Sequence, residues 1–191
     1  AHGVRRADVQ AGEWVLVAGA GPIGLGVIAF ATIAGAQVIV LDVNDARLAF
    51  CREHFGIQHT INARTQDVFA TITNITGGDR CGVVIDATGN LHAINSAFPY
   101  LAHGGRYVLV GLQKGDIQFS HPEFHKREST LMSSRNATRS DFAFVIDCIK
   151  NQRVNPLAFI THRVPFDQAG SEFHHWLDPA GGVIKAMIEM D

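Results

Sequence analysis

The stretch VLVAGAGPIGLG, residues 15–26, decides the fold. Four hydrophobic residues lead into a glycine-rich turn with the spacing Gly-x-Gly-x-x-Gly. A short apolar run that stops at glycine predicts a buried strand, and Pro22 with the apolar residues after it predicts the start of a helix. A strand that passes into a helix through such a turn is typical of a phosphate-binding loop.

Each glycine of this turn has its own physical role. Gly19 permits the tight turn out of the strand, and Gly21 has no Cβ, so a pyrophosphate can approach the backbone there. Gly24 lets the helix pack closely against the strand. The helix start then offers free N–H groups and the positive end of its dipole to phosphate. The spacing alone is common, and its place between a strand and a helix is what favours a dinucleotide.

Hydrophobic strands and helices alternate along most of the chain. Strands are predicted at residues 13–19, 36–44, 58–62, 81–90, 106–113 and 129–134. Helices are predicted at residues 22–35, 45–56, 65–78, 91–105 and 139–152, with Asp45 as the N-cap of the second. The helix at 91–105 is expected to bend or end near Pro99. This alternation predicts an α/β fold, a Rossmann doubly wound parallel sheet of about six strands with helices on both faces. We expect a dinucleotide-binding domain at residues 1–155 and a strand-helix-strand segment at 156–191.

Asp42 supplies the second half of a dinucleotide fingerprint. It lies 21 positions after Gly21, at the end of the second predicted strand. An acid about 20 residues after the turn binds the adenosine ribose hydroxyls and repels a 2′-phosphate. No pair of basic residues stands beside it to take such a phosphate. The sequence therefore predicts NAD rather than NADP, and the glycine spacing is not the GxGxG usual in a methyltransferase.

Composition narrows the possible partners and compartments. The formal net charge is −2 and no long basic run occurs, which argues against nucleic acid or an anionic membrane as the main partner. No apolar stretch reaches the roughly 18 residues of a membrane span, and the first residues contain no signal peptide. Cys51, Cys81 and Cys148 are too few and too far apart for a disulfide framework or zinc ribbon. We therefore expect three separate free thiols, and no residue near Cys51 or Cys81 in sequence supports a role as a nucleophile. Free thiols also favour a cytoplasmic protein.

The histidines and one further acid are weaker candidates for chemistry. His121 and His125 stand four apart, with Glu123 between them, which suits a metal pair on a helix face. Because no third ligand is evident, we expect a solvated segment and no metal site. Structural roles are favoured over chemistry for His162, His174, His175 and Asp86. Asp86 in particular is expected to form structural hydrogen bonds just before the loop that follows it, rather than to act as an acid or base.

Several motifs together resemble one known family. They are GAGPIGLG, DVNDARL, DATGN, GGRYVLVGL, SSRNATRSDF and ITHRVPF followed by GGVIKAMIE. The chain resembles the zinc-dependent medium-chain alcohol dehydrogenases over its whole length, and within them the sorbitol and sugar-acid dehydrogenase branch. The resemblance implies hydride transfer between a secondary alcohol and NAD. It also implies a zinc-binding catalytic domain upstream, a Rossmann domain, and a last segment that packs on the catalytic domain.

The resemblance assigns cofactor contacts in the first half of the chain. The pyrophosphate loop is matched by Gly19, Gly21, Pro22, Ile23 and Gly24. Asp42 matches the ribose-binding acid, and Arg47 matches a basic residue that helps to hold the same ribose. Ala87 and Thr88 match the loop that flanks adenine and the nicotinamide ribose.

Further contacts are implied in the second half. The stretch whose backbone meets the nicotinamide carboxamide is matched by Val110, Gly111 and Leu112. A strand end near the nicotinamide and the substrate is matched by Ser134, Arg135 and Asn136. Lys185 matches a basic residue that can reach the pyrophosphate.

The family's catalytic zinc ligands lie upstream of the stretch that matches the first residues here. We therefore expect no catalytic and no metal-binding residue in this chain, zinc only in the intact protein, and no catalysis by the chain alone. An alternative is a stand-alone dinucleotide-binding module that senses redox state, and the zinc-free quinone-reductase branch is a third interpretation. The resemblance also implies a homodimer joined through the edge strand at 130–134, and apolar surface around Phe159, Val164 and Phe166.

Overall fold

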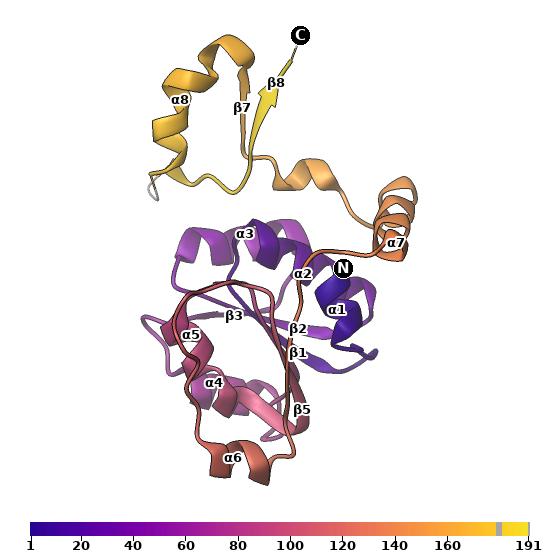
Figure 1. The fold of residues 1–191 in the computed structure, drawn as a ribbon, viewed down its shortest axis with the longest axis vertical. Coiled ribbons are helices and arrows are strands. Elements are labelled where there is room, and N and C mark those ends of the chain that lie inside the picture. The colour runs from indigo at the N-terminus through magenta and orange to yellow at the C-terminus, as the bar shows by residue number, and fades with distance from the viewer. Residues whose placement is uncertain (179–180, 191) are drawn as a thin grey trace. The chain divides into compact units, whose positions relative to one another are not determined.

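The structure is a computed structural model that describes residues 1–178 and 181–190. Two compact units make up the chain, residues 1–146 and residues 147–191 (Figure 1). The first unit contains the glycine-rich turn and nearly all of the predicted site. Each unit is described by itself.

The first unit is built on a six-stranded sheet in which every neighbouring pair is parallel. Its strands are β1 (Trp14–Ala18), β2 (Gln37–Asp42), β3 (His59–Asn62), β4 (Cys81–Asp86), β5 (Leu101–Leu109) and β6 (Thr130–Ser133). Their spatial order is β3-β2-β1-β4-β5-β6. The order reverses between β1 and β4, as in two mononucleotide-binding halves joined back to back. The predicted Rossmann fold is confirmed.

Helices cover both faces of this sheet. The helices of this unit are α1 (His2–Arg6), α2 (Pro22–Ile33), α3 (Asp45–Phe55), α4 (Val68–Ile75), α5 (Leu91–Ser96) and α6 (His121–Lys126), and α7 (Arg139–Lys150) begins in it. In Figure 1, α2 and α3 lie on one side of the strands, and α4 and α5 lie on the other. Because both faces are covered, Val15 to Ala18 in β1 are all buried, and the strand is apolar without alternation.

Local sequence signals explain most helix ends. Gly21 is the N-cap of α2 and Pro22 its first residue, and Gly35 follows the helix with a positive φ of 84°. One prediction was wrong: the N-cap of α3 is Asn44, not Asp45. The Asn44 side chain accepts hydrogen bonds from the N–H groups of Ala46 and Arg47, so the helix begins at Asp45, one residue earlier than an Asp45 cap would allow.

The segment after β4 departs from its predicted form. A helix over residues 91–105 that bends or ends near Pro99 was predicted; α5 ends at Ser96, and a 3₁₀ turn, Phe98–Tyr100, leads directly into β5. Pro99 has no N–H group to continue the helix ladder, so the chain turns there. The strand then starts at Leu101, and its pairing with β4 shifts register between Cys81 and Val83. Short helices α1 and α6 also lie outside the predicted set.

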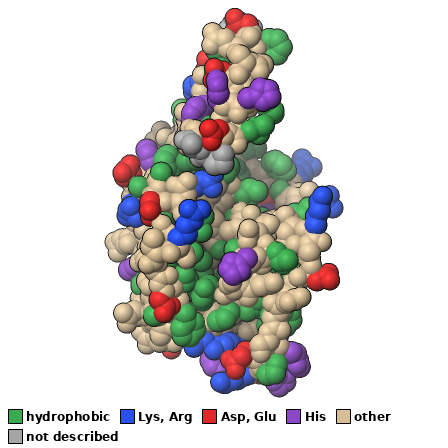
Figure 2. Space-filling model, turned by 90° about the vertical axis from the view of Figure 1, so that its left-hand side faces the viewer, with side chains coloured by type: hydrophobic (Ala, Val, Ile, Leu, Met, Phe, Trp, Pro, Cys, Tyr) green, Lys and Arg blue, Asp and Glu red, His purple; other side chains and the backbone are tan. Residues whose placement is uncertain are grey.

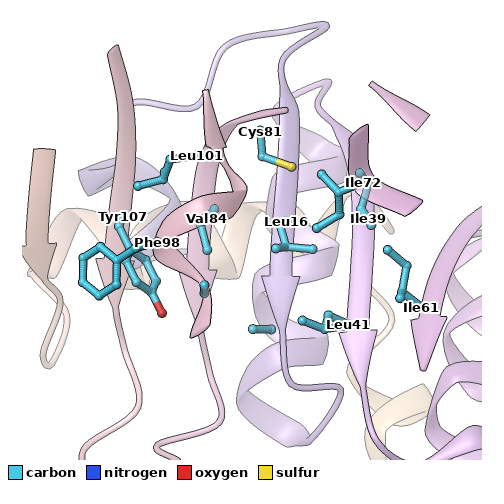
Figure 3. Close-up of a cluster of buried hydrophobic side chains, with 12 residues drawn as sticks. Leu16, Ile39, Leu41, Ile61, Ile72, Cys81, Val84, Phe98, Leu101 and Tyr107 are labelled. Carbon is cyan, nitrogen blue, oxygen red and sulfur yellow. The ribbon is translucent and has the colours of Figure 1, made fainter. Parts of the chain in front are cut away.

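A cluster of buried side chains lies between the sheet and its helices (Figure 3). Leu16, Ile39 and Val84 come from the three central strands, and Ile72 reaches them from α4. Tyr107 of β5 is fully buried, and its hydroxyl donates a hydrogen bond to the carbonyl oxygen of Ile94 at 3.1 Å. This bond satisfies the one polar atom that Tyr107 brings into the cluster.

The second unit contains a small parallel pair of strands. They are β7 (His162–Pro165) and β8 (Ala186–Glu189), and the helix α8 (Ala169–Trp176) lies between them in sequence. The predicted strand-helix-strand pattern is confirmed. Of the apolar residues expected at the surface, Phe166 is 65% exposed, whereas Phe159 and Val164 are partly buried.

Charged side chains are scattered over the face drawn in Figure 2, where Lys and Arg alternate with Asp and Glu and form no continuous basic surface. Across the described residues, no helix is long and apolar enough to cross a lipid bilayer. That nucleic acid and membranes are not partners stays a prediction.

The three cysteines are free thiols, and all are buried. Burial raises the pKa of the Cys51 thiol to about 12, with a smaller contribution from the nearby charge of Asp42. Burial alone raises the pKa of the Cys81 thiol to about 12. Because the thiolate is the reactive form, neither side chain is suited to act as a nucleophile near neutral pH.

Substituting Gly24 tests the close approach of α2 to the turn. An added Cβ at Gly24 would lie 1.7 Å from the Gly19 carbonyl oxygen, so the helix must move away. We expect Gly24→Ala to lower the free energy of unfolding by about 2 kcal/mol or more, measured by urea unfolding followed by circular dichroism.

Gly26, two residues along the same helix, is the matched control. Among the described residues, no heavy atom outside its chain neighbours and its own helix backbone lies within 4 Å of an added Cβ there, so Gly26→Ala is expected to be neutral or to stabilise by up to about 1 kcal/mol. Equal losses of stability in the two variants would contradict the proposed packing role of Gly24.

The buried thiols give a second prediction. At pH 8 a chromogenic disulfide reagent should label none of the three cysteines in the folded chain, because each is buried and the thiols of Cys51 and Cys81 stay protonated. Unfolding in guanidinium chloride should release all three for labelling. Rapid labelling of Cys51 or Cys81 before unfolding would contradict their placement in the core.

Candidate functional site

The candidate site lies along one edge of the sheet, where all six parallel strands end. The register pairs Ala18 with Leu41 and with Asp86. It also pairs Leu109 with Asp86 and with Ser133. The segments that follow these strands therefore start in one row. Each contains residues that the sequence predicts as cofactor contacts, so the fold brings together groups that lie more than 100 residues apart in sequence.

The glycine-rich turn is held firmly at the end of β1. The Gly19 N–H donates to the Leu41 carbonyl oxygen at 2.7 Å, and Gly19 itself has a φ of +98°, which a side chain would strain. The first turn of α2 contains no acidic residue. Its unpaired N–H groups and the positive end of its dipole therefore favour an anion at this position.

Space is open over Gly21. The heavy atom found within 4 Å of an added Cβ at Gly21 is Nη1 of Arg47, at 3.9 Å. Arg47 is in the first turn of α3, five residues after Asp42. Its guanidinium therefore extends toward the glycine-rich turn. A phosphate group that approached the backbone at Gly21 would meet this positive charge. The open space and the cation fit a pyrophosphate.

Asp42 closes β2 and is tied to the turn by a hydrogen bond. Its side chain is 8% exposed, and its Oδ2 accepts the Ala20 N–H at 2.6 Å. Its Oδ1 accepts the N–H groups of Val43 at 2.7 Å and Asn44 at 2.9 Å. A carboxylate offers about four lone-pair sites, so these three bonds leave one acceptor position, on Oδ2, for a ligand hydroxyl.

The loops after β4 and β5 touch each other. Gly111 lies so close to Gly89 that an added Cβ would stand 2.3 Å from the Gly89 nitrogen. Gly89 has a φ of +60°, and its own added Cβ would lie 2.9 Å from the Leu112 carbonyl oxygen. The Leu112 side chain is 93% exposed. Ala87 and Thr88 lie in the first loop, and Val110 to Leu112 in the second, so the structure places these predicted contacts side by side.

A cleft of about 490 Å³ opens beside the glycine-rich turn. Six of the predicted contacts line it: Pro22, Ile23, Val110, Ser134, Arg135 and Asn136. The Ile23 side chain is 55% exposed. An exposed apolar side chain at the mouth of a cleft that also holds Arg135 offers both an apolar face for a ring and a positive charge.

Backbone geometry fixes the strand end on the far side of the cleft. The Ser134 N–H donates to the Leu109 carbonyl oxygen at 2.8 Å, and Asn136 adopts a φ of +60°. Lys185 is the one predicted contact outside the first unit. It precedes β8 in the second unit, and its carbonyl oxygen accepts the Thr161 N–H at 3.0 Å. Its predicted role at the pyrophosphate stays a prediction.

The cleft also contains residues that the sequence did not single out. His2 Nδ1 lies 2.8 Å from Asp141 Oδ2, and Arg5 Nε donates to Asp141 Oδ1 at 2.7 Å. Hydrogen bonds from Arg5, and then from Thr138, hold the pKa of the Asp141 carboxyl well below its usual range. This cluster joins α1 to the first turn of α7. Because His2 and Arg5 lie 136 residues or more from Asp141 in sequence, no local pattern pointed to this contact.

Of the weaker histidine candidates, His121 and His125 lie beside each other. The His121 and His125 rings lie 5.9 Å apart on the short helix α6. In the part of the chain that the structure describes, no group of three or more His, Cys, Asp or Glu side chains could hold a metal ion. Nδ1 of His162 lies 2.9 Å from the Thr161 hydroxyl. None of these side chains lines the cleft beside the turn.

The sheet edge therefore combines three chemical capabilities. The turn and helix start can bind an anion, Asp42 can accept a hydroxyl hydrogen, and the exposed Ile23 and Leu112 can pack against an aromatic ring. A dinucleotide contains pyrophosphate, ribose diols and aromatic rings. These residues fit such a cofactor, and the open space above Gly21 fits its pyrophosphate.

Comparisons with known proteins agree with this geometry. The sequence of the chain is 47% identical over 191 residues to L-galactonate-5-dehydrogenase of Escherichia coli (strain K12), covering 98% of this chain and 55% of that protein. It is 30% identical to L-arabinitol 4-dehydrogenase of Aureobasidium melanogenum, covering 98% of this chain and 52% of the relative. The chain thus spans about half the length of the curated relatives that it matches.

A solved structure gives the same picture of the fold. The chain matches an oxidoreductase/dehydrogenase of unknown specificity from Escherichia coli with a TM-score of 0.91 and 26% identity, covering all of this chain and 54% of that one. The family described as zinc-binding dehydrogenase matches residues 22–151, from the start of α2 to just after α7. The resemblance seen in the sequence is confirmed, and the chain belongs to the zinc-binding dehydrogenase family.

Proposed function

We propose that this chain is the NAD-binding part of a zinc-dependent dehydrogenase that acts on a secondary alcohol of a sugar acid or polyol. The observation that carries the proposal is the bond between Asp42 Oδ2 and the Ala20 N–H inside the glycine-rich turn. This bond places a ribose-binding carboxylate and a pyrophosphate-binding turn against each other before any ligand arrives. Two halves of one cofactor are thereby recognised by one connected structure.

The proposed cofactor is NAD rather than NADP. Asp42 is nearly buried and already accepts three N–H groups, which holds its carboxylate at the end of β2. A fixed negative charge there would repel a 2′-phosphate and accept a hydrogen bond from the ribose hydroxyl instead. Arg47 stands beside Gly21, where it would meet the pyrophosphate.

The remaining predicted contacts receive roles along the cofactor. We assign the pyrophosphate to Gly19, Gly21, Pro22 and Gly24, with Lys185 as a further contact from the second unit. Ala87 and Thr88 would flank the adenine and the nicotinamide ribose. The nicotinamide end would lie among Ile23, Val110, Gly111, Leu112, Ser134, Arg135 and Asn136, seven residues that line the cleft or stand beside it.

NAD supplies a carbon that can accept a hydride when it is bound. The residues of this chain bind and orient it, and their exposed apolar side chains, Ile23 and Leu112, exclude water from one side of the ring. Following the family resemblance, we propose that the zinc ligands of the intact enzyme lie outside this chain. The sugar-acid and polyol substrates named for the two relatives support the proposed substrate class.

The proposal includes an assembly and a compartment. Strand β6 is an edge of the sheet, so one side of its backbone has no strand partner among the described residues. We propose that two copies pair through residues 130–134 to form a homodimer. We also propose that segment 156–191 packs on the catalytic domain of the intact enzyme, and that the enzyme works in the cytoplasm, where its free thiols stay reduced.

Cofactor titration tests the central part of the proposal. NADH should bind the chain more tightly than NADPH, measured by fluorescence or calorimetry. Asp42→Ala should weaken NADH binding by about tenfold or more and narrow the gap to NADPH, since it removes both the ribose acceptor and the negative charge.

Asp79→Ala is the matched control for this titration. Asp79 is an exposed carboxylate ahead of β4, at the opposite edge of the sheet, so its removal should leave both affinities unchanged. Tighter binding of NADPH than of NADH by the unmodified chain would refute the proposed cofactor preference.

Sedimentation equilibrium tests the proposed dimer. The chain should sediment with twice the mass of one copy, and Thr130→Lys should shift it toward the monomer, because it adds a charged side chain to each of the two paired edges. Thr130 is exposed, so this change leaves the core intact. A monomer at all concentrations in the unmodified chain would rule out pairing through β6.

A further inference from the structure

Asp86 is a buried acid with no assigned role in the proposed reaction. It is the last residue of β4, next to the point where the strand order reverses, and it is 0% exposed. Among its hydrogen-bond partners in the described part of the chain, there is no cationic side chain. Burying a carboxylate without a counter-charge is costly, so neutral donors must compensate it.

The donors that compensate this carboxylate all come from the next three residues. Oδ1 accepts the Thr88 N–H at 3.2 Å and the Thr88 hydroxyl at 2.5 Å. Oδ2 accepts the Gly89 N–H at 3.2 Å. The Thr88 oxygen in turn accepts the Asn90 N–H at 3.0 Å. One side chain therefore fixes the whole turn from Ala87 to the start of α5.

The same residue also holds the loop after β5. Its carbonyl oxygen accepts the N–H groups of Val110 at 2.9 Å and Gly111 at 3.1 Å. Gly111 packs directly against the carboxylate, since an added Cβ there would lie 2.7 Å from Asp86 Oδ2. The main chain and the side chain of Asp86 thus reach two different loops, and the carboxylate lies where those loops meet.

We propose that Asp86 is a positioning residue that sets the spacing between loop 87–90 and loop 110–112 before the cofactor binds. The inference rests on the proposed function, which assigns loop 87–90 to the adenine and the nicotinamide ribose and loop 110–112 to the nicotinamide. The hydroxyl and the N–H of Thr88 both donate hydrogen bonds to Asp86. The loop therefore has a fixed shape and presents its backbone and apolar surface to the cofactor. Preorganised loops lower the entropy that binding would otherwise cost.

Asp86→Asn is the direct test. The amide keeps the shape of the carboxyl group but has only one acceptor oxygen, so its NH₂ must face Thr88 or Gly89, both of which donate. NADH binding should weaken about tenfold. Binding of ADP should weaken by clearly less than binding of NADH, because ADP reaches only the adenine side of loop 87–90 and none of loop 110–112.

The ratio of the two affinities separates positioning from general damage, which would weaken both ligands together. Asp79→Asn, at the opposite end of the same strand, is the control and should change neither affinity. Equal weakening of NADH and ADP in Asp86→Asn, or no weakening of either, overturns this inference alone. A parent chain that binds neither ligand overturns the proposed function and this inference with it.

Amide hydrogen exchange on the ligand-free parent chain tests the same point without a variant. The N–H groups of Thr88, Gly89, Val110 and Gly111 should be protected at a level close to that of the β4 backbone. Rapid exchange of these amides, with protection only after NADH is added, would show that the cofactor orders the loops and would overturn the inference. This measurement decides the question if Asp86→Asn does not fold.

Discussion

The close approach of helix α2 to the glycine-rich turn is the contact on which the rest of the site depends. Gly24 lies against the Gly19 carbonyl oxygen with no room for a methyl group. This approach aims the start of α2 at the space over Gly21, where the proposed pyrophosphate would lie. It also keeps Ala20 beside Asp42, so the position of the carboxylate that is proposed to bind ribose follows from the same packing.

Two aspartates organise the backbone on either side of this turn. Asp42 ends β2 and Asp86 ends β4, the two strands that flank β1. Each carboxylate is nearly or fully buried and accepts three hydrogen bonds, mostly from backbone N–H groups. The two carboxylates differ in whether an acceptor position remains free for a ligand. Asp42 keeps an acceptor position for a ligand at the edge of the protein, whereas Asp86 is enclosed by the loops that it holds. In the proposed function, Asp42 therefore recognises the ribose, and Asp86 positions the two loops.

The sequence predicted the sheet and its order of elements because buried parallel strands are continuous apolar runs and the helices between them end at glycine or proline. The contacts that the resemblance assigned lie at one edge, since the carboxyl ends of parallel strands share an edge. Exact helix ends were less reliable. Asn44 replaced Asp45 as the N-cap of α3, and α5 ends at Ser96, ahead of the expected end near Pro99.

Long-range polar contacts escaped the sequence altogether. The cluster of His2, Arg5 and Asp141 depends on α1 meeting the start of α7, and no local spacing encodes that meeting. The several bonds of Asp86 were foreseen only as a general structural role. Their consequence, a link between two loops, depends on Gly111 packing against the carboxylate. Such details follow from tertiary packing rather than from residue type.

An NMR titration of the chain with NADH tests the central claim most directly, because it locates the ligand residue by residue. The account predicts that the largest backbone amide shifts occur at Gly19 to Gly24, after Asp42, at Thr88 and Gly89, and at Val110 to Leu112. Shifts confined to other parts of the chain, or no shifts at saturating NADH, would contradict the account.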